Sequence, residues 1–199
     1  MTHPTLKSGD KLVLATHNAG KLAEFSALMA EFGITVLSAG ELHLPEPEET
    51  ATTFAGNAAI KALAAAQAAN LPALADDSGL CVSALGGAPG IYSARWAGPE
   101  KDFNAAMARI EEGIGQDERD AWFVCVLCLA FPDGRTLSFE GRINGQIVWP
   151  PRGGNGHGYD PIFEPENETR SFAQMTDEEK NAISHRARAF AAFRKACLD

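Results

Sequence analysis

Residues 11–37 carry the pattern that most constrains the fold of this chain. Residues 11–16 form a short apolar run that leads into polar and glycine residues, which indicates a buried strand followed by a turn. Apolar residues then recur at helical spacing, namely Leu22, Phe25, Leu28, Met29 and Phe32, and Gly33 marks the end of the helix. Residues 34–37 predict a second strand. Because a strand, a helix and another strand form a βαβ unit, we expect at least part of the sheet to be parallel.

The rest of the chain continues with helical and strand patterns. We expect further helices over residues 53–70, 102–112 and 176–197, the last of which starts with a capping box. We expect strands over residues 72–75, 121–131, 135–141 and 142–149, with the Asp76-Asp77-Ser78-Gly79 sequence ending the first of them. The predicted fold class is α/β, an elongated mixed sheet with flanking helices and two lobes around a central cleft. We expect a single domain over residues 1–199, with the second lobe at approximately 120–150.

The charge balance limits the class of partner. The chain has 199 residues, with 17 Lys and Arg against 26 Asp and Glu, and a formal net charge of −9. Nucleic acids and anionic membranes require a basic surface, so we expect neither as a partner. A nucleotide substrate remains compatible, because it needs only a few well-placed cations. Residues 1–10 do not resemble a secretory signal, and the longest apolar run, 121–131, is shorter than a membrane span, so we expect a cytoplasmic protein.

The cysteines offer a metal-binding alternative. Cys125 and Cys128 have the spacing of a zinc knuckle, but no second Cys/His pair accompanies them. They also lie within an apolar run that is typical of a buried strand. We therefore favour core packing over metal or redox chemistry for these thiols.

Two groups of polar residues suit phosphate and metal binding. The sequence from Thr16 to Lys21 combines a predicted helix N-terminus with a lysine, which favours phosphate, although a solvated lysine is the simpler interpretation. Asp76 and Asp77 follow an apolar run, and the acidic loop over residues 46–49 precedes them in the chain. Carboxylates of this kind suit Mg²⁺, which binds one or two carboxylates plus substrate phosphate oxygens. The alternative is a helix-capping Asp beside a solvated neighbour.

Two further groups suit recognition of the rest of a ligand. Residues 153–161 are rich in glycine, which lets the backbone approach a ligand closely, although a structural loop explains the same composition. Lys180, Ser184 and His185 are expected on one side of the C-terminal helix, where a solvated face is the alternative. Together the four groups predict Mg²⁺-assisted attack on a nucleotide phosphate.

The same residues carry a resemblance to a known family. The matching blocks are Leu14-Ala-Thr-His-Asn-Ala-Gly-Lys21, Glu49-Thr-Ala-Thr-Thr-Phe54 with Asn57 and Lys61, Ala75-Asp-Asp-Ser-Gly-Leu80, Gly86-Gly-Ala-Pro-Gly-Ile-Tyr-Ser-Ala-Arg95, Gly156-His-Gly-Tyr-Asp-Pro-Ile-Phe163 and Glu179-Lys-Asn-Ala-Ile-Ser-His-Arg186. In this order and over nearly the whole chain, they resemble the inosine triphosphate pyrophosphatase family, especially its bacterial dITP/XTP pyrophosphatase branch. The resemblance implies a Mg²⁺-dependent homodimeric enzyme that splits ITP, dITP and XTP into the monophosphate and pyrophosphate, thereby cleansing the nucleotide pool.

The resemblance also implies roles for individual residues. The phosphates would be bound by Thr16, His17, Asn18, Ala19, Gly20, Lys21 and Lys61. The metal would be held by Glu49 and Asp77, with Asp76 beside them and Glu48 as the alternative ligand. Asp77 would be the catalytic proton acceptor, and Ser78 would contact the substrate. The base would be enclosed by His157, Gly158, Tyr159 and Asp160, with Lys180, His185 and Arg186 completing the pocket.

Two departures and two rival interpretations accompany the resemblance. The family commonly has an aromatic residue in place of His157 and Glu in place of Gly56, which affects base stacking and removes a carboxylate near the metal site. A Maf-like nucleotide pyrophosphatase is one rival, but residues 16–21 do not fit its opening motif. A catalytically idle nucleotide-binding module is the other, and the retained carboxylates and lysines disfavour it.

Overall fold

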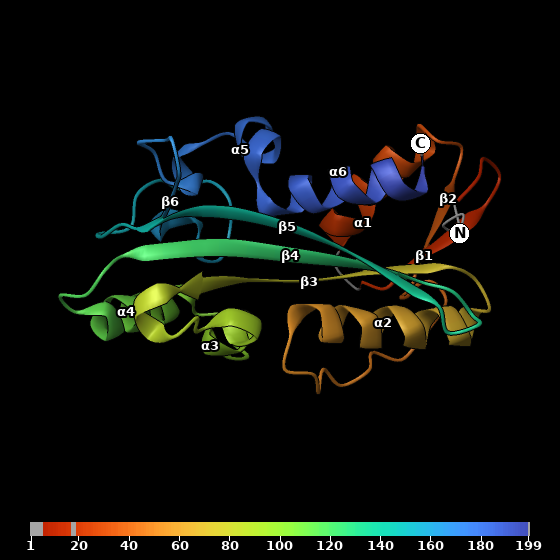
Figure 1. Cartoon of the computed structure of the whole chain (residues 1–199), viewed down its shortest axis with the longest axis horizontal. Helices are drawn as coiled ribbons and strands as arrows, with labels where there is room; N and C mark the ends of the chain where they lie inside the picture. Colours follow the sequence, from red (N-terminus) through yellow and green to blue (C-terminus); the bar gives the residue numbers. More distant parts are fainter. Residues whose placement is uncertain (1–5, 17–18, 199) are drawn as a thin grey trace. The chain divides into compact units, whose positions relative to one another are not determined.

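The computed structural model describes residues 6–16 and 19–198 (Figure 1). The helices and strands are β1 (Lys11–Leu14), α1 (Ala19–Ala30), β2 (Thr35–Ser38), α2 (Phe54–Ala69), β3 (Ala73–Val82), α3 (Ser93–Trp96), α4 (Phe103–Ile114), β4 (Asp120–Ala130), β5 (Thr136–Ile147), β6 (Phe163–Pro165), α5 (Asp177–Ile183) and α6 (His185–Cys197). None of the helices in this part of the chain has the length and apolar composition of a membrane span.

The strands form one mixed sheet. It has six strands in the order β2-β1-β3-β4-β5-β6. Strand β1 pairs in parallel with both β2 and β3, whereas β5 and β6 are antiparallel. The mixed α/β class and the βαβ unit at the start of the chain are thus confirmed.

Two compact units divide the chain. The first comprises Met1–Asp77, Val126–Glu140 and Ala189–Asp199, and the second comprises Ser78–Cys125 and Gly141–Arg188. Residues 120–150, the predicted second lobe, are therefore shared by the two units. The assignment of the whole chain to a single domain stays a prediction.

In the first unit, helices cover both faces of the sheet. Helices α1 and α6 lie on one face and α2 lies on the other (Figure 1). Phe25 of α1 and Phe190 of α6 contact each other edge to face, with ring centroids 5.9 Å apart. Because helices cover both faces of strand β1, the neighbouring side chains of Leu12 and Val13 are both buried although they point to opposite faces. The apolar residues on both faces of the strand suit this burial.

The second unit has an aromatic core. Phe123 of β4 contacts Phe163 of β6 with ring centroids 4.7 Å apart, and Phe163 contacts Phe172 at 5.2 Å. Ile110 and Ile114 of α4 belong to the same cluster of buried side chains. This core supports the loops that carry the residues predicted to read the base.

Three predicted boundaries were wrong. Strand β3 does not end at Asp76 but runs on to Val82, and the Leu80 N–H donates to Ser93 Oγ. The separate strand over 142–149 is the continuation of β5, whose side chains alternate between buried and exposed across Gly141. The C-terminal helix is broken at Ser184, where an extended backbone ends α5 and the hydroxyl accepts the Ala187 N–H at the start of α6.

The cysteines belong to the core. Cys81, Cys125, Cys128 and Cys197 are free thiols and all are buried. Burial raises the pKa of the Cys128 thiol and raises that of Cys197 to about 11, which disfavours the reactive thiolate. Within residues 6–16 and 19–198, no three His, Cys, Asp or Glu side chains are grouped to hold a metal ion. The burial of both thiols confirms the core-packing interpretation of Cys125 and Cys128.

Candidate active site

Two carboxylates of the first unit share one lysine. Lys61 Nζ lies 2.6 Å from Glu49 Oε1 and 4.0 Å from Asp77 Oδ1. The side chains of Lys61 and Asp77 are only 14% and 10% exposed, whereas that of Glu49 is 29% exposed. Among the side chains that the structure describes, one ammonium group thus faces two carboxylates in a partly buried cluster.

The start of helix α2 positions this cluster. Thr53 caps the helix, and its side chain accepts the Gly56 N–H at 3.0 Å. Asn57 and Lys61 follow at a spacing of four residues, so they lie on the same face of the helix, one turn apart. Asp77 comes from β3, and Glu49 comes from the loop that precedes α2. A strand, a helix and a loop therefore each supply one charged group.

The environment of Asp77 shifts its acidity. Burial raises the pKa of the Asp77 carboxyl to about 6, and the neighbouring charges of Glu49 and Asp76 act in the same direction. The Lys61 ammonium and a hydrogen bond from Asn57 oppose this shift. A carboxylate with a pKa close to neutral is a better proton acceptor than an ordinary Asp, since a general base works best with a pKa near the working pH.

The donor set of the cluster fits Mg²⁺. Mg²⁺ is typically held by one or two carboxylates together with substrate phosphate oxygens and water, rather than by a complete cage of protein ligands. The Lys61 ammonium lies within ion-pair distance of both Glu49 and Asp77, so the two carboxylates lie on the same side of the first unit. Asp76 precedes Asp77 on β3 and is half-buried, and Glu48, the alternative ligand, is exposed beside Glu49. The observed ion pair favours Glu49 over Glu48.

The predicted phosphate-binding segment is described only in part. Thr16 directly follows β1, and its N–H donates to the Leu14 carbonyl at 2.9 Å. His17 and Asn18 lie outside the described residues. Ala19, Gly20 and Lys21 begin α1, of which the structure describes the backbone at these positions.

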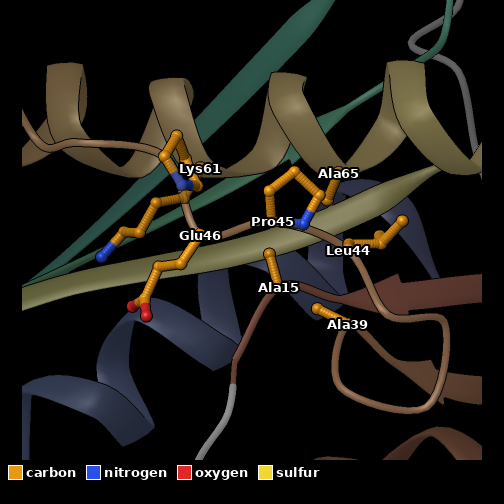
Figure 2. A pocket seen from close by; sticks show the side chains of 8 residues that line it. Ala15, Ala39, Leu44, Pro45, Glu46, Lys61 and Ala65 are labelled. Carbon is orange, nitrogen blue, oxygen red and sulfur yellow. The ribbon is translucent and has the colours of Figure 1, made fainter.

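A small pocket adjoins Lys61 in the same unit. It encloses about 290 Å³, including open solvent at its mouth. The lining residues are Ala15, Ala39, Leu44, Pro45, Glu46, Pro47, Lys61 and Ala65. Figure 2 shows the polar ends of Lys61 and Glu46 on one side of this pocket, with Leu44 and Ala65 on the other. The loop before α2 thus places apolar surface next to the charged cluster.

A second lysine–carboxylate pair lies in the second unit. Asp160 Oδ2 accepts hydrogen bonds from Lys180 Nζ and from the His157 N–H, the latter at 2.9 Å. The side chains of Lys180 and Asp160 are only 12% and 4% exposed. A Cβ on Gly156 would lie 2.2 Å from Asp160 Oδ2, which explains the glycine there. This pair is balanced, one cation to one anion, and it fixes the glycine-rich loop.

The remaining residues of the glycine-rich loop have different environments. Tyr159 is buried, its hydroxyl donates to the Ser93 carbonyl at 2.7 Å, and its ring contacts Phe103 edge to face. Burial raises the pKa of the Tyr159 hydroxyl to about 12. His157 is exposed, and Gly158 has a positive φ of 65°. The phenol of Tyr159 is therefore part of the core, whereas His157 lies at the surface.

The residues after Lys180 do not share one helix. Because Ser184 breaks the helix, the expectation that Lys180, Ser184 and His185 line one helical side was wrong. His185 is buried and stacks on Phe123, with ring centroids 4.8 Å apart and an angle of 12° between the ring planes. Arg186 is half-buried on α6, and Ser78 is half-buried on β3, directly after Asp77.

Sequence reasoning gave no role to two residues that organise these sites. Asn57 is buried and contacts the Asp77 carboxylate, and Ser93 accepts the Leu80 N–H with its side chain and the Tyr159 hydroxyl with its carbonyl. An Asn in an otherwise Ala-rich helix, four residues before a lysine, was the available signal for Asn57. No comparable signal marks Ser93, because its partners are distant in the sequence.

Comparison with known proteins identifies the family. The model of the Ham1 family matches residues 12–196. A dITP/XTP pyrophosphatase of Gluconobacter oxydans is 63% identical over 195 residues, which cover 98% of this chain and 94% of that protein. The chain belongs to the Ham1 family. The resemblance inferred from the sequence blocks is thereby confirmed.

Solved structures of Ham1 proteins share the fold. A HAM1 protein from Coxiella burnetii matches with a TM-score of 0.89 and 40% identity, covering 93% of this chain and 96% of that one. A nucleoside-triphosphatase / dITP/XTP pyrophosphatase from Mycobacterium abscessus matches with a TM-score of 0.79 and 42% identity, covering 92% and 98%. The mixed α/β architecture is therefore that of the Ham1 family.

Proposed function

We propose that this chain is a nucleoside triphosphate pyrophosphatase that hydrolyses the nonstandard purine nucleotides ITP, dITP and XTP to the monophosphate and pyrophosphate. The observation that carries the proposal is the cluster of Glu49 and Asp77 around Lys61, in a chain of the Ham1 family whose relatives are named dITP/XTP pyrophosphatases. Two carboxylates beside a lysine suit a substrate that arrives with a divalent cation.

Glu49 and Asp77 are the proposed ligands of Mg²⁺, with Asp76 nearby. When bound, Mg²⁺ neutralises charge on a triphosphate and lowers the pKa of a coordinated water. The Asp77 carboxylate accepts the proton of the attacking water. Attack is in line at the α-phosphorus, and pyrophosphate leaves. Lys61, together with Lys21 and the backbone amides after Thr16, stabilises the charge that builds up on the leaving group.

Base selection is proposed to depend on the 6-position of the purine. Hypoxanthine and xanthine carry a carbonyl acceptor there, whereas adenine carries an amino donor. Donors from His185, Arg186 or the backbone of residues 157–160 pair with the carbonyl and stay unpaired opposite adenine. Leaving buried polar groups unpaired gives strong discrimination between substrates. A homodimer acting in the cytoplasm on the nucleotide pool completes the proposal.

The decisive assay is pyrophosphate release from ITP, XTP, dITP and the four standard triphosphates, each with and without Mg²⁺. We expect Mg²⁺-dependent release from the three nonstandard nucleotides and much less from ATP. Similar kcat/KM values for ATP and ITP would contradict the proposed base reading. Absence of release from every nucleotide would instead favour a binding module.

A further inference from the structure

Asn57 is a buried polar side chain beside the charged cluster. It lies in the first turn of α2 and is only 1% exposed. A buried amide is costly unless its oxygen and nitrogen are both hydrogen-bonded, so its partners indicate what the residue holds in place.

The two ends of the Asn57 amide contact two different segments. Oδ1 accepts the Ala51 N–H at 3.0 Å, two residues after Glu49. The side chain is also hydrogen-bonded to the Asp77 carboxylate. Because a carboxylate accepts hydrogen bonds and Oδ1 is engaged by Ala51, the amide nitrogen is the donor to Asp77. One side chain therefore joins the loop of Glu49 to the strand of Asp77.

Gly56 brings the same loop against the helix. A Cβ at Gly56 would lie 2.6 Å from Ala51 Cβ and 3.0 Å from Thr53 Oγ1. Real Cβ atoms do not approach so closely, so a side chain at this position would push Ala51 away. The absence of a side chain lets the segment after Glu49 pack directly on the first turn of α2. This contact gives a physical reason for Gly56, at a helical position where glycine is otherwise unfavourable.

We propose that Gly56 and Asn57 form a seat for the 49–51 segment and that Asn57 is a positioning residue, which holds Glu49 and Asp77 in the arrangement that binds a divalent cation. This inference rests on the proposed function, because that function requires both carboxylates to reach one Mg²⁺. Lys61 lies one helical turn after Asn57, so the same helix sets the position of the lysine and of both carboxylates. Asn57 supports the two carboxylates without being a proposed metal ligand itself, and residues that support metal ligands commonly tune metal affinity.

The first test is Asn57→Ala, with two measurements. Amide hydrogen exchange followed by NMR reports the Ala51 N–H, which we expect to exchange at least about 10-fold faster once its acceptor is gone. The Mg²⁺ concentration that gives half-maximal pyrophosphate release from ITP is expected to rise by about 10-fold, the lower end of the range for residues that support metal ligands. Thermal unfolding of the same sample measures the accompanying loss of stability.

Ala66→Gly is the matched control. Ala66 is buried on the same helix, and glycine there weakens α2 without changing the residues around Ala51 and Asp77. We expect this variant to have a lower midpoint of thermal unfolding. Its Ala51 exchange rate and the Mg²⁺ concentration for half-maximal pyrophosphate release (the Mg²⁺ requirement) should keep their wild-type values. A purely structural role for Asn57 predicts instead that the two variants behave alike.

Gly56→Ala is the second variant, and it carries the test if Asn57→Ala does not fold. It keeps the Asn57 amide but introduces the Cβ that would meet Ala51 at 2.6 Å. We expect faster exchange at Ala51 and a Mg²⁺ requirement raised by roughly 2- to 5-fold, a weaker form of the effect of losing a supporting residue. These changes are expected even though alanine is the better helix former.

Two results would overturn the seat: unchanged protection of the Ala51 N–H in both variants, or an unchanged Mg²⁺ requirement in both. Failure of the proposed function has a different signature, because the wild-type protein would then release no pyrophosphate in the presence of Mg²⁺. The exchange rate at Ala51 tests the contacts of the seat in either case.

Discussion

Two lysine–carboxylate groups in the described part of the chain differ in how many carboxylates face the lysine. In the second unit, Lys180 faces one carboxylate, Asp160, which also accepts the His157 N–H. In the first unit, Lys61 faces both Glu49 and Asp77, and burial raises the pKa of Asp77 to about 6. We call the first-unit group, with two carboxylates for one described lysine, the unbalanced cluster, and the second-unit group, with one of each, the balanced pair. The balanced pair stabilises a loop, whereas the unbalanced cluster has the carboxylate ligands that suit Mg²⁺.

The largest expected effect is on catalysis at the unbalanced cluster. The substitution Asp77→Asn removes the proposed proton acceptor and one proposed metal ligand while preserving the shape of the side chain. We expect kcat for ITP to fall by at least about 100-fold, since a positioned general base contributes about 10²–10⁴ in rate. Steady-state pyrophosphate release measures the loss, and urea denaturation serves as the control for folding. Near-normal turnover would contradict the assignment of Asp77 as the proton acceptor.

Disrupting the balanced pair is expected to lower the free energy of unfolding. Replacing Lys180→Met leaves the Asp160 carboxylate buried without its cation. Breaking a buried ion pair in this way typically costs about 3 kcal/mol or more. Urea denaturation measures the unfolding free energy, and the double variant with Asp160→Asn is expected to recover part of the loss. If the single variant were as stable as wild type, the pair would have no structural role.

The pH dependence of stability separates the two groups further. The Asp77 pKa rises from 3.8 to about 6 on folding, so the folded protein binds a proton more readily than the unfolded chain. The unfolding free energy of the metal-free wild type, relative to Asp77→Asn, should therefore increase by about 1 kcal/mol from pH 8 to pH 5. Urea denaturation at the two pH values, without Mg²⁺, measures this difference. A decrease on acidification would mean that the folded state lowers the pKa.

The smallest effect is expected at the exposed end of the balanced site. His157 contacts Asp160 through its backbone N–H, so His157→Phe should leave that contact in place. A larger aromatic ring should stack better on a purine and lower KM for ITP by roughly 2- to 5-fold, in line with about 0.5–1 kcal/mol for an aromatic contact. Steady-state kinetics with ITP test this prediction. An unchanged or higher KM would argue against stacking at this position.

Much of the fold follows from short-range sequence patterns. The βαβ unit, α2, α4 and the hairpin of β4 and β5 were predicted because each has a strong periodicity or turn signal. The break at Ser184 was not predicted because the helical pattern of the sequence continues through it. The structure shows that Ser184 has an extended backbone and that its hydroxyl accepts the Ala187 N–H at the start of α6. Strand β3 was cut short because Asp76 and Asp77 resemble a strand end, although the strand continues through them.

The candidate site was predictable in its residue types but not in its contacts. Glu49, Lys61 and Asp77 were named from their chemistry and from the resemblance, and the structure brings these three together within the first unit. Asn57 had no role in the prediction, because its two partners, Ala51 and Asp77, meet only after α2 has packed beside β3. Contacts between segments distant in sequence require the folded chain.

The central claim is that the unbalanced carboxylates of the first unit, and not the balanced pair of the second, set the requirement for Mg²⁺. The most direct measurement is pyrophosphate release from ITP as a function of Mg²⁺ concentration for the wild type, Asp77→Asn and Asp160→Asn. We predict Mg²⁺-dependent release by the wild type, a loss of at least about 100-fold in Asp77→Asn, and an unchanged half-saturating Mg²⁺ concentration in Asp160→Asn. Release by the wild type without Mg²⁺, or a Mg²⁺ requirement that shifts in Asp160→Asn and not in Asp77→Asn, would contradict the account.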